Sequence, residues 1–227
     1  SSPPETDVCL ANMGIYVFSG NMMTEALKGD ETDFGKEIIP GMLGKAKLFG
    51  FIFDDYWEDI GTVRAFFDCN LELTSANPPF NFFDSEHLIY TRARFLPSCK
   101  LLNCTASEVI VSGASIIHEC RLVRSVIGVR SMIGAGSEFE NVVMMGADYI
   151  ENDEEKAHNA EKARPDIGVG KNCRIRNAII DKNARIGDNV TLDPEGKPDH
   201  WQDGAIYVRD GILVVKKNGI IPSGTTV

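Results

Sequence analysis

The chain has 227 residues, of which 43% are hydrophobic, so it can hold one large domain or two small ones with a buried core. Its formal net charge of −10 argues against a nucleic-acid coat or a surface for anionic membranes, although a local basic cluster could still bind phosphate. No apolar run reaches the roughly 18 residues of a membrane span, and no signal peptide is visible.

Residues 1–75 alternate strand and helix signals, a pattern typical of an α/β arrangement. Buried strands are expected at residues 13–18 and 47–53, where apolar side chains are concentrated. These elements are too few to close a sheet of normal size, so we interpret this segment as part of a larger domain.

Three helices are expected in the same segment. Asn21 can cap a short helix that runs to Leu27. Asp33 can cap a helix over residues 34–39, which Pro40 would end or kink. Thr62 can cap a third helix that extends through Leu71.

Residues 76–105 are irregular and rich in proline, which predicts a connector. From about residue 106, aliphatic residues recur every six positions, mostly followed by a small or polar residue. This period fits neither an α-helix nor a half-exposed strand, but it fits a three-sided parallel β-helix. The expected inward positions are Val111, Ile117, Leu122, Ile127, Ile133, Phe139, Met145, Val169, Ile175, Ile180, Ile186, Leu192, Val215, Ile221 and Val227.

Two segments interrupt this repeat. Residues 147–166 are expected to leave the coil as a loop or short helix, with the acidic run 151–155 forming a solvated face. Residues 193–205 form the second excursion.

The six cysteines are scattered, with no CxxC pair and no histidine at zinc-ligand spacing. They are Cys9, Cys69, Cys99, Cys104, Cys120 and Cys173. We expect reduced, mostly buried thiols in a cytosol-like compartment rather than a disulfide framework.

The segment from Tyr56 to Thr62 carries the most chemistry. Asp59 lies between an aromatic strand end and a Gly-Thr helix start, where α/β sheets bind ligands. The alternative is an acid that only stabilises a helix N-terminus through the helix dipole.

Six ordered segments together resemble ADP-glucose pyrophosphorylase (glucose-1-phosphate adenylyltransferase), and the resemblance spans essentially the whole chain. They are residues 13–18, 33–40, 56–62, 125–131, 145–149 and 178–187. The resemblance implies a Mg²⁺-dependent enzyme that joins ATP and glucose 1-phosphate into ADP-glucose and pyrophosphate for glycogen or starch synthesis. It also implies a homo- or hetero-tetramer controlled by a phosphorylated metabolite effector.

Part of the family's pattern has no counterpart here: the glycine-rich nucleotide loop, the first metal-binding Asp and the Glu-Lys pair that holds the sugar phosphate. The segments Gly134-Ala135-Gly136 and Gly168-Val169-Gly170 are expected in β-helix turns and do not replace that loop. We therefore expect the carboxy-terminal portion of the enzyme, which contains no catalytic residue and is inactive in isolation. Its fold class would be α/β plus all-β: residues 1–75 from the nucleotidyltransferase domain, the connector 76–105, and a left-handed β-helix over 106–227.

The resemblance gives substrate and metal roles to three residues. Asp59 matches the second metal-ligand Asp; because Mg²⁺ takes one or two carboxylates with phosphate oxygens, a second acid must come from elsewhere. Trp57 matches an aromatic residue beside the substrates, with core packing as its alternative role. Asn12 stands where the family usually has a Ser that hydrogen-bonds glucose 1-phosphate, and Asn can likewise donate and accept.

The resemblance also suggests an effector site. Lys217 matches an activator-binding Lys, Lys197 could match a second one, and Arg94 in the connector could join them. Lysines and an arginine that converge between two domains would form a phosphate pocket. The alternative is solvated surface charge.

Two other functions stay open. In a hexapeptide-repeat acyltransferase, a turn histidine such as His118 would be the general base, although we expect it to be inert. In a non-catalytic regulatory or assembly subunit, the β-helix would mediate oligomerisation. The expected compartment is the bacterial cytoplasm, or the plastid stroma if the source is a plant or alga; no nucleic-acid or membrane partner is expected.

Overall fold

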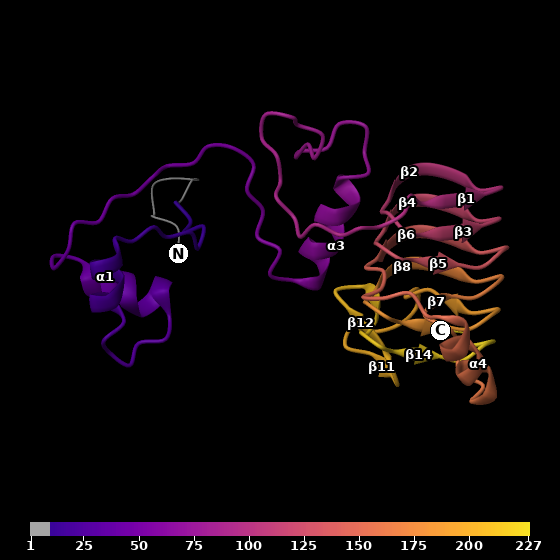
Figure 1. Ribbon diagram of the computed structural model, residues 1–227. Coiled ribbons are helices and arrows are strands. Elements are labelled where there is room, and N and C mark those ends of the chain that lie inside the picture. Colours follow the sequence, from indigo (N-terminus) through magenta and orange to yellow (C-terminus); the bar gives the residue numbers. More distant parts are fainter. Residues whose placement is uncertain (1–9) are drawn as a thin grey trace. The chain divides into compact units, whose positions relative to one another are not determined.

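The computed structural model describes residues 10–227 (Figure 1), so the expectation for Cys9 lies outside the described residues. The chain forms two compact units, one ending at Trp57 and the other beginning at Glu58. This division falls earlier in the sequence than the expected domain boundary at residue 75, which stays a prediction. No helix among the described residues has the length and apolar character needed to span a bilayer.

The described part of the first unit, residues 10–57, contains three short helical elements: α1 (Gly20–Ala26), the π-helical η1 (Phe34–Ile38) and α2 (Ile39–Met42). Asp33 caps η1 as expected, since its carboxylate accepts a hydrogen bond from the Lys36 N–H at 2.8 Å. The expected Asn21 cap is wrong, because α1 begins one residue earlier, after Ser19. Pro40 does not end the helix but lies in the first turn of α2. Backbone N–H groups in the first turn have no partner within the helix, so proline's missing N–H costs no hydrogen bond there.

Neither strand expected in the first unit forms. Residues 13–18 and 47–53 have no strand pairing, and Val17, Phe49 and Phe51 are 97%, 91% and 89% exposed. A strand exists only through hydrogen bonds to a neighbouring strand, and residues 10–57 contain no such partner. In residues 10–57, the apolar pattern of these two segments therefore corresponds neither to paired backbone nor to buried side chains.

The second unit is a three-sided parallel β-helix, in which successive coils stack along one axis (Figure 1). One sheet forms a single side. Its strands, in spatial order, are β1 (Lys100–Leu102), β3 (Ile116–His118), β5 (Met132–Ile133), β7 (Gly168–Val169), β9 (Arg185–Ile186) and β14 (Ile220–Ile221). The coil thus begins at Lys100, before the expected residue 106.

The other sheet bends to form the remaining two sides. Its parallel strands are β2 (Thr105–Val111), β4 (Arg121–Ile127), β6 (Glu138–Met144), β8 (Arg174–Ile180), β10 (Thr191–Leu192) and β13 (Ile212–Val215). Each seven-residue strand bends at its fourth residue, which has a positive φ and is skipped in the pairing; these residues are Glu108, Arg124, Asn141 and Asn177. One strand therefore supplies two sides of the prism.

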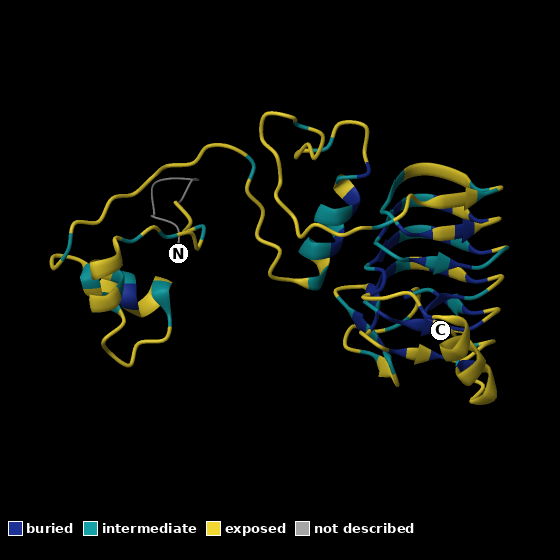
Figure 2. Ribbon diagram, in the orientation of Figure 1, coloured by how far each residue is buried: buried dark blue, intermediate teal, exposed yellow. Residues whose placement is uncertain are grey.

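The inward aliphatic residues stack coil on coil to form one core cluster, and Figure 2 shows buried positions along the stacked strands. Ile127, Ile133, Ile180 and Ile186 are at most 3% exposed, which confirms the predicted inner wall. Val111 and Val227 are only partly buried and pack against the same core. The predicted core positions hold with the single exception of Met145.

Met145 is wrong as an inward residue. Met144, which is 3% exposed, takes that place because β6 pairs it with Ile127 on one neighbour and Ile180 on the other. The bend at Asn141 shortens the step from Phe139, so the strict six-residue period fails there.

Helix α3 (Val63–Glu72) covers the outer face of one side (Figure 1). Phe67 and Leu71 pack against Val143, Ile179 and Ile212. Thr62 caps the helix as expected, since its hydroxyl oxygen accepts from the Ala65 N–H at 3.1 Å. This apolar contact is the reason why residues from 58 onward belong to the β-helix unit.

The first excursion carries α4 (Asp153–Glu161), which begins with a capping box formed by Asn152 and Glu155. The acidic run is not entirely a solvated face, however. Glu151 is buried and forms an ion pair with Arg185 of β9 at 2.6 Å, with side chains 3% and 10% exposed. This charged pair anchors the excursion on the coil.

Burial alone would raise the pKa of Glu151, but hydrogen bonds from the Ile167 N–H and the Asn159 amide, together with Arg185, outweigh it and lower the pKa. The second excursion continues into β11 (Gln202–Asp203) and β12 (Ile206–Arg209). Strand β11 pairs antiparallel with β12, and β12 pairs antiparallel with β13.

The expectation of mostly buried thiols holds only in part for the described cysteines: Cys120 and Cys173 are buried, Cys69 and Cys104 are half-buried, and Cys99 is exposed. Burial raises the pKa of Cys120 to about 11, so this thiol is a core residue rather than a nucleophile.

The stacked core predicts unequal effects for two adjacent isoleucines of β3. Ile117 is fully buried, whereas Ile116 points outward and is 43% exposed. We expect Ile117→Ala to lower the free energy of unfolding by about 2–5 kcal/mol, through lost burial and a cavity. Ile116→Ala, the matched control, should cost well under half of that. Equilibrium denaturant unfolding measures both, and equal losses would contradict the inward stacking.

The buried ion pair predicts a pH dependence. Because the pKa of Glu151 in the folded protein is below its ordinary 4.5, its contribution to stability is complete above pH 4.5 and is lost as pH falls through the folded value. Glu151→Gln leaves the Arg185 charge uncompensated and should cost about 3 kcal/mol at pH 7. It should also flatten the loss of stability below pH 4.5. The exposed Glu154→Gln on the same excursion should do neither, as measured by unfolding at several pH values.

Candidate functional site

Asp59 lies in a short loop that is folded by local hydrogen bonds. Its Oδ1 accepts from the Gly61 N–H at 3.0 Å, and three residues after Asp59, Thr62 caps α3. The Asp59 residue is exposed, so its carboxylate is accessible to a ligand. Both readings of the sequence fit this placement: the acid precedes a helix start and can reach solvent.

Among residues 10–227, no three Asp, Glu, His or Cys side chains gather into a metal-binding group. Asp59 fits Mg²⁺ as one carboxylate ligand, because Mg²⁺ binds through one or two carboxylates and completes its shell with water and phosphate oxygens. The other oxygen ligands are not supplied by Asp59 alone.

Asn12 and Trp57 belong to the first unit, whereas Asp59 belongs to the second. The Asn12 amide nitrogen donates to the Tyr16 hydroxyl at 2.6 Å, and its oxygen accepts from the Gly14 N–H at 2.9 Å. Trp57 is 40% exposed, so the alternative of a core tryptophan does not describe it. The roles predicted for Asn12 and Trp57 stay predictions.

Lys217 has a neighbour that the sequence reasoning missed. The Lys217 Nζ lies 3.4 Å from one Asp148 oxygen, and the Lys182 Nζ lies 3.2 Å from the other. Two ammonium groups therefore share one carboxylate on the surface of the β-helix.

The coil register explains why these lysines meet. The Asn218 N–H donates to the Lys182 carbonyl at 2.9 Å, so the two Lys-Asn turns stack in successive coils. Each lysine precedes an inward isoleucine, Ile186 or Ile221, by the same number of residues. That shared spacing was the available sequence signal, and it becomes meaningful once the repeat is aligned coil by coil.

The Asp148 carboxylate is strongly held in its ionised form. Hydrogen bonds from the Asn183 amide and from Lys182 and Lys217 lower the pKa of Asp148 to about 2. The side chains of all three charged residues are between 37% and 53% exposed. Exposed ion pairs are weak because water and salt screen them, so an incoming phosphate can compete with Asp148 for both lysines.

Lys197 and Arg94 have different surroundings. The Lys197 ammonium lies over the Trp201 ring, 5.0 Å from its centroid. Arg94 is exposed in the connector. Among the described residues, no hydrogen bond or ion pair joins Lys197 or Arg94 to Lys217. Their proposed share in an effector pocket stays a prediction.

His118 is about half-exposed and lies beside Glu119, with 3.4 Å between Nε2 and Oε1. This contact with an adjacent surface carboxylate gives no indication of a catalytic base.

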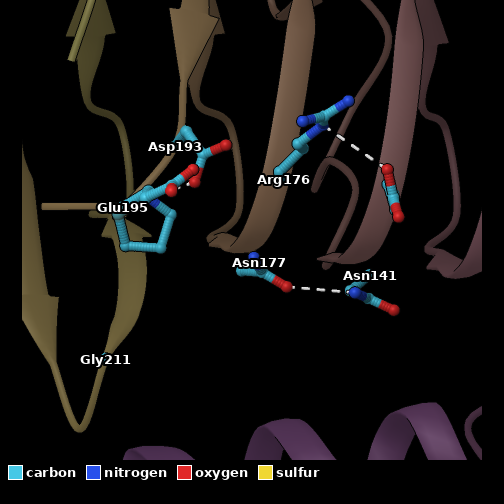
Figure 3. A pocket seen from close by; sticks show the side chains of 8 residues that line it. Asn141, Arg176, Asn177, Asp193, Glu195 and Gly211 are labelled. Atoms are coloured by element: carbon cyan, nitrogen blue, oxygen red, sulfur yellow. Dashed lines mark hydrogen bonds and ion pairs between the residues drawn. The ribbon is translucent and has the colours of Figure 1, made fainter.

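A cavity of about 380 Å³ lies elsewhere on the β-helix, between the outer face of β6 and β8 and the tip of the β12–β13 hairpin (Figure 3). It is lined by Glu140, Asn141, Arg176, Asn177, Asp193, Pro194, Glu195 and Gly211. Arg176 is paired with Glu140, and the Asn141 amide donates to Asn177. Its carboxylates outnumber its one arginine, so charge favours the exposed lysine pair over this cavity as a phosphate site.

Two family models match the chain. The model described as a GLGC left-handed parallel beta-helix domain matches residues 94–226, and the model described as nucleotidyl transferase matches residues 3–76. These matches confirm the predicted fold class, an amino-terminal nucleotidyltransferase segment followed by a left-handed parallel β-helix.

The lysine pair predicts phosphate binding that depends on both side chains. Lys182→Ala and Lys217→Ala should each weaken binding of inorganic phosphate by about three- to tenfold, because each removes one charge-assisted contact. Lys171→Ala, an exposed turn lysine elsewhere on the coil, is the matched control. Isothermal calorimetry at low salt measures these affinities. Equal binding by all three variants would contradict a site at the lysine pair.

Proposed function

The chain belongs to the ADP-glucose pyrophosphorylase-like proteins, and on this premise we propose that it functions as the carboxy-terminal portion of a glucose-1-phosphate adenylyltransferase. The reaction joins ATP and glucose 1-phosphate into ADP-glucose and pyrophosphate. The two family matches support a sugar-phosphate nucleotidyltransferase but do not specify its substrates. The choice of glucose 1-phosphate and ATP rests on the six ordered segments of the sequence.

The single observation that carries this proposal is the order of the two matches. A nucleotidyl transferase segment precedes this particular type of β-helix on one chain. A hexapeptide-repeat acyltransferase would share a β-helix but not the preceding segment, so the pair of matches favours nucleotidyl transfer.

Asp59 is the residue proposed to hold Mg²⁺. When bound there, the ion would offset negative charge on the transferring phosphoryl group and on pyrophosphate. The chain's own contribution is to fix the carboxylate: the Gly61 N–H orients one of its oxygens, and the capped start of α3 follows directly. Trp57 would lie beside the substrates, and Asn12 would contact the sugar phosphate after releasing Tyr16.

For regulation, we propose that the phosphorylated effector binds at Lys217 and Lys182, where it would compete with Asp148 for the two ammonium groups. Lys197 and Arg94 are proposed as further contacts. A tetramer in the bacterial cytoplasm or plastid stroma follows from the resemblance and belongs to the same proposal.

The proposal is tested by ADP-glucose formation from ATP, glucose 1-phosphate and Mg²⁺. We expect no turnover by the chain alone, and turnover after addition of a separately expressed segment that carries the family's glycine-rich loop. In that mixture, Asp59→Asn should lower kcat about 100-fold or more, because it weakens charge stabilisation in the transition state. Asp55→Asn, whose carboxylate also accepts a neighbouring backbone N–H, should leave kcat nearly unchanged.

Each contrary outcome points to a different alternative. Turnover by the chain alone would overturn the expectation that this portion is inactive in isolation. No turnover in the mixture would favour a regulatory or assembly subunit. Saturable binding of coenzyme A near His118 would favour the acyltransferase.

A further inference from the structure

The start of α3 is held by a residue far away in the sequence. Asp210, at the tip of the β12–β13 hairpin, accepts a hydrogen bond from the Arg64 N–H, with 3.2 Å between N and Oδ2. The Arg64 guanidinium also donates to the Asp210 carbonyl oxygen at 2.6 Å. One pair of residues thus fastens the helix to the hairpin by two hydrogen bonds.

This contact completes the cap of the helix. The first N–H groups of an α-helix have no partner within the helix. The Thr62 hydroxyl satisfies the Ala65 N–H, and Asp210 satisfies the Arg64 N–H. A carboxylate at this end is also favoured by the helix dipole. The β-helix therefore supplies a second cap that the local sequence does not contain.

The hairpin presents Asp210 through a tight turn. Arg209 and Ile212 are paired across the hairpin, which leaves Asp210 and Gly211 as a two-residue connection. Both have positive φ, +53° and +72°, as a type I′ turn requires. Asp, Asn and Gly suit this conformation, but of these only Asp and Asn carry a side-chain oxygen that can accept from Arg64.

Asp59 lies directly before the capped turn. Only Ile60 and Gly61 separate it from Thr62, and the Asp59 carboxylate is itself bonded to the Gly61 N–H. A displacement of the first turn of α3 would therefore move this carboxylate.

We propose that Asp210 is a positioning residue: it fixes the first turn of α3 against the β-helix and thereby places the Asp59 carboxylate for its ligand. This inference rests on the proposed role of Asp59 as a metal ligand. The Asp210 N–H also donates to Asp199 at 2.8 Å, so the excursion that carries Lys197 is tied to the same hairpin tip.

The turn geometry allows a well-matched set of variants in the full chain. Asp210→Gly keeps a residue suited to positive φ but removes the carboxylate, whereas Asp210→Asn keeps both the turn and an accepting oxygen. Asp203→Ala removes an exposed carboxylate from the adjoining strand β11 and serves as the control.

The first measurement is amide hydrogen exchange, which needs no metal. In Asp210→Gly, the amides of residues 63–67 should exchange about fivefold faster, as expected for loss of one cap contact. Asp210→Asn and Asp203→Ala should stay within about twofold of the unmodified chain, and α4 should be unchanged in all variants. Unchanged exchange at residues 63–67 in Asp210→Gly would overturn the proposal, as would the same acceleration in Asp210→Asn.

The second measurement follows Mn²⁺ alone through the fluorescence of Trp57, two residues before Asp59. The chain has two tryptophans, so Trp201→Phe leaves Trp57 as the reporter. The Mn²⁺ concentration for half-maximal quenching should rise about three- to tenfold in Asp210→Gly, and Asp210→Asn should restore it nearly to the starting value.

The two failures can be told apart. If Asp59→Asn leaves the quenching unaltered, the proposed metal role of Asp59 is wrong, whatever the hydrogen exchange shows. If Asp59→Asn abolishes the quenching but Asp210→Gly does not shift it, Asp59 is a ligand that Asp210 does not position, and the inference is overturned.

Discussion

Most of the second unit depends on the stacking of aliphatic side chains in register from coil to coil. Each coil sends one residue inward from each side, and each must lie above its counterpart because a close-packed interior leaves no room for a shifted one. Ile127, Met144, Ile180 and Val215 follow this rule on one side although two excursions interrupt the chain between them. The pairing register stays the same from one coil to the next, although the number of residues between the stacked positions varies.

The same register controls the outer surface. Because each turn lies on the turn of the preceding coil, residues distant in sequence become neighbours: Lys182 and Lys217 meet at Asp148 in this way. The excursions are tied back by contacts of a different kind. The buried Glu151–Arg185 pair anchors one, and the β12–β13 hairpin, joined to α3 at Arg64, extends the other. A rigid prism thus places polar groups at positions that no single loop could hold.

The candidate site shows the limits of sequence reasoning. The cap at Thr62 and the loop around Asp59 are encoded by residues within a few positions of each other, so the sequence alone predicts them. Asp210 and Lys182 could not be found in that way, since their partners become adjacent only after the coils have stacked. Strands at residues 13–18 and 47–53 were predicted wrongly for the opposite reason: the local pattern is present, but the pairing partner is not among residues 10–57.

The sequence by itself determined the inner wall of the β-helix, the caps of η1 and α3, and the family, because each depends on side-chain types at short, regular spacing. Tertiary structure decided that Met144 rather than Met145 points inward, that Glu151 is buried rather than solvated, and which charged residues meet on the surface. These outcomes depend on bends, pairings and contacts between segments many residues apart. No local pattern contains that information, since it arises when one coil is laid on another.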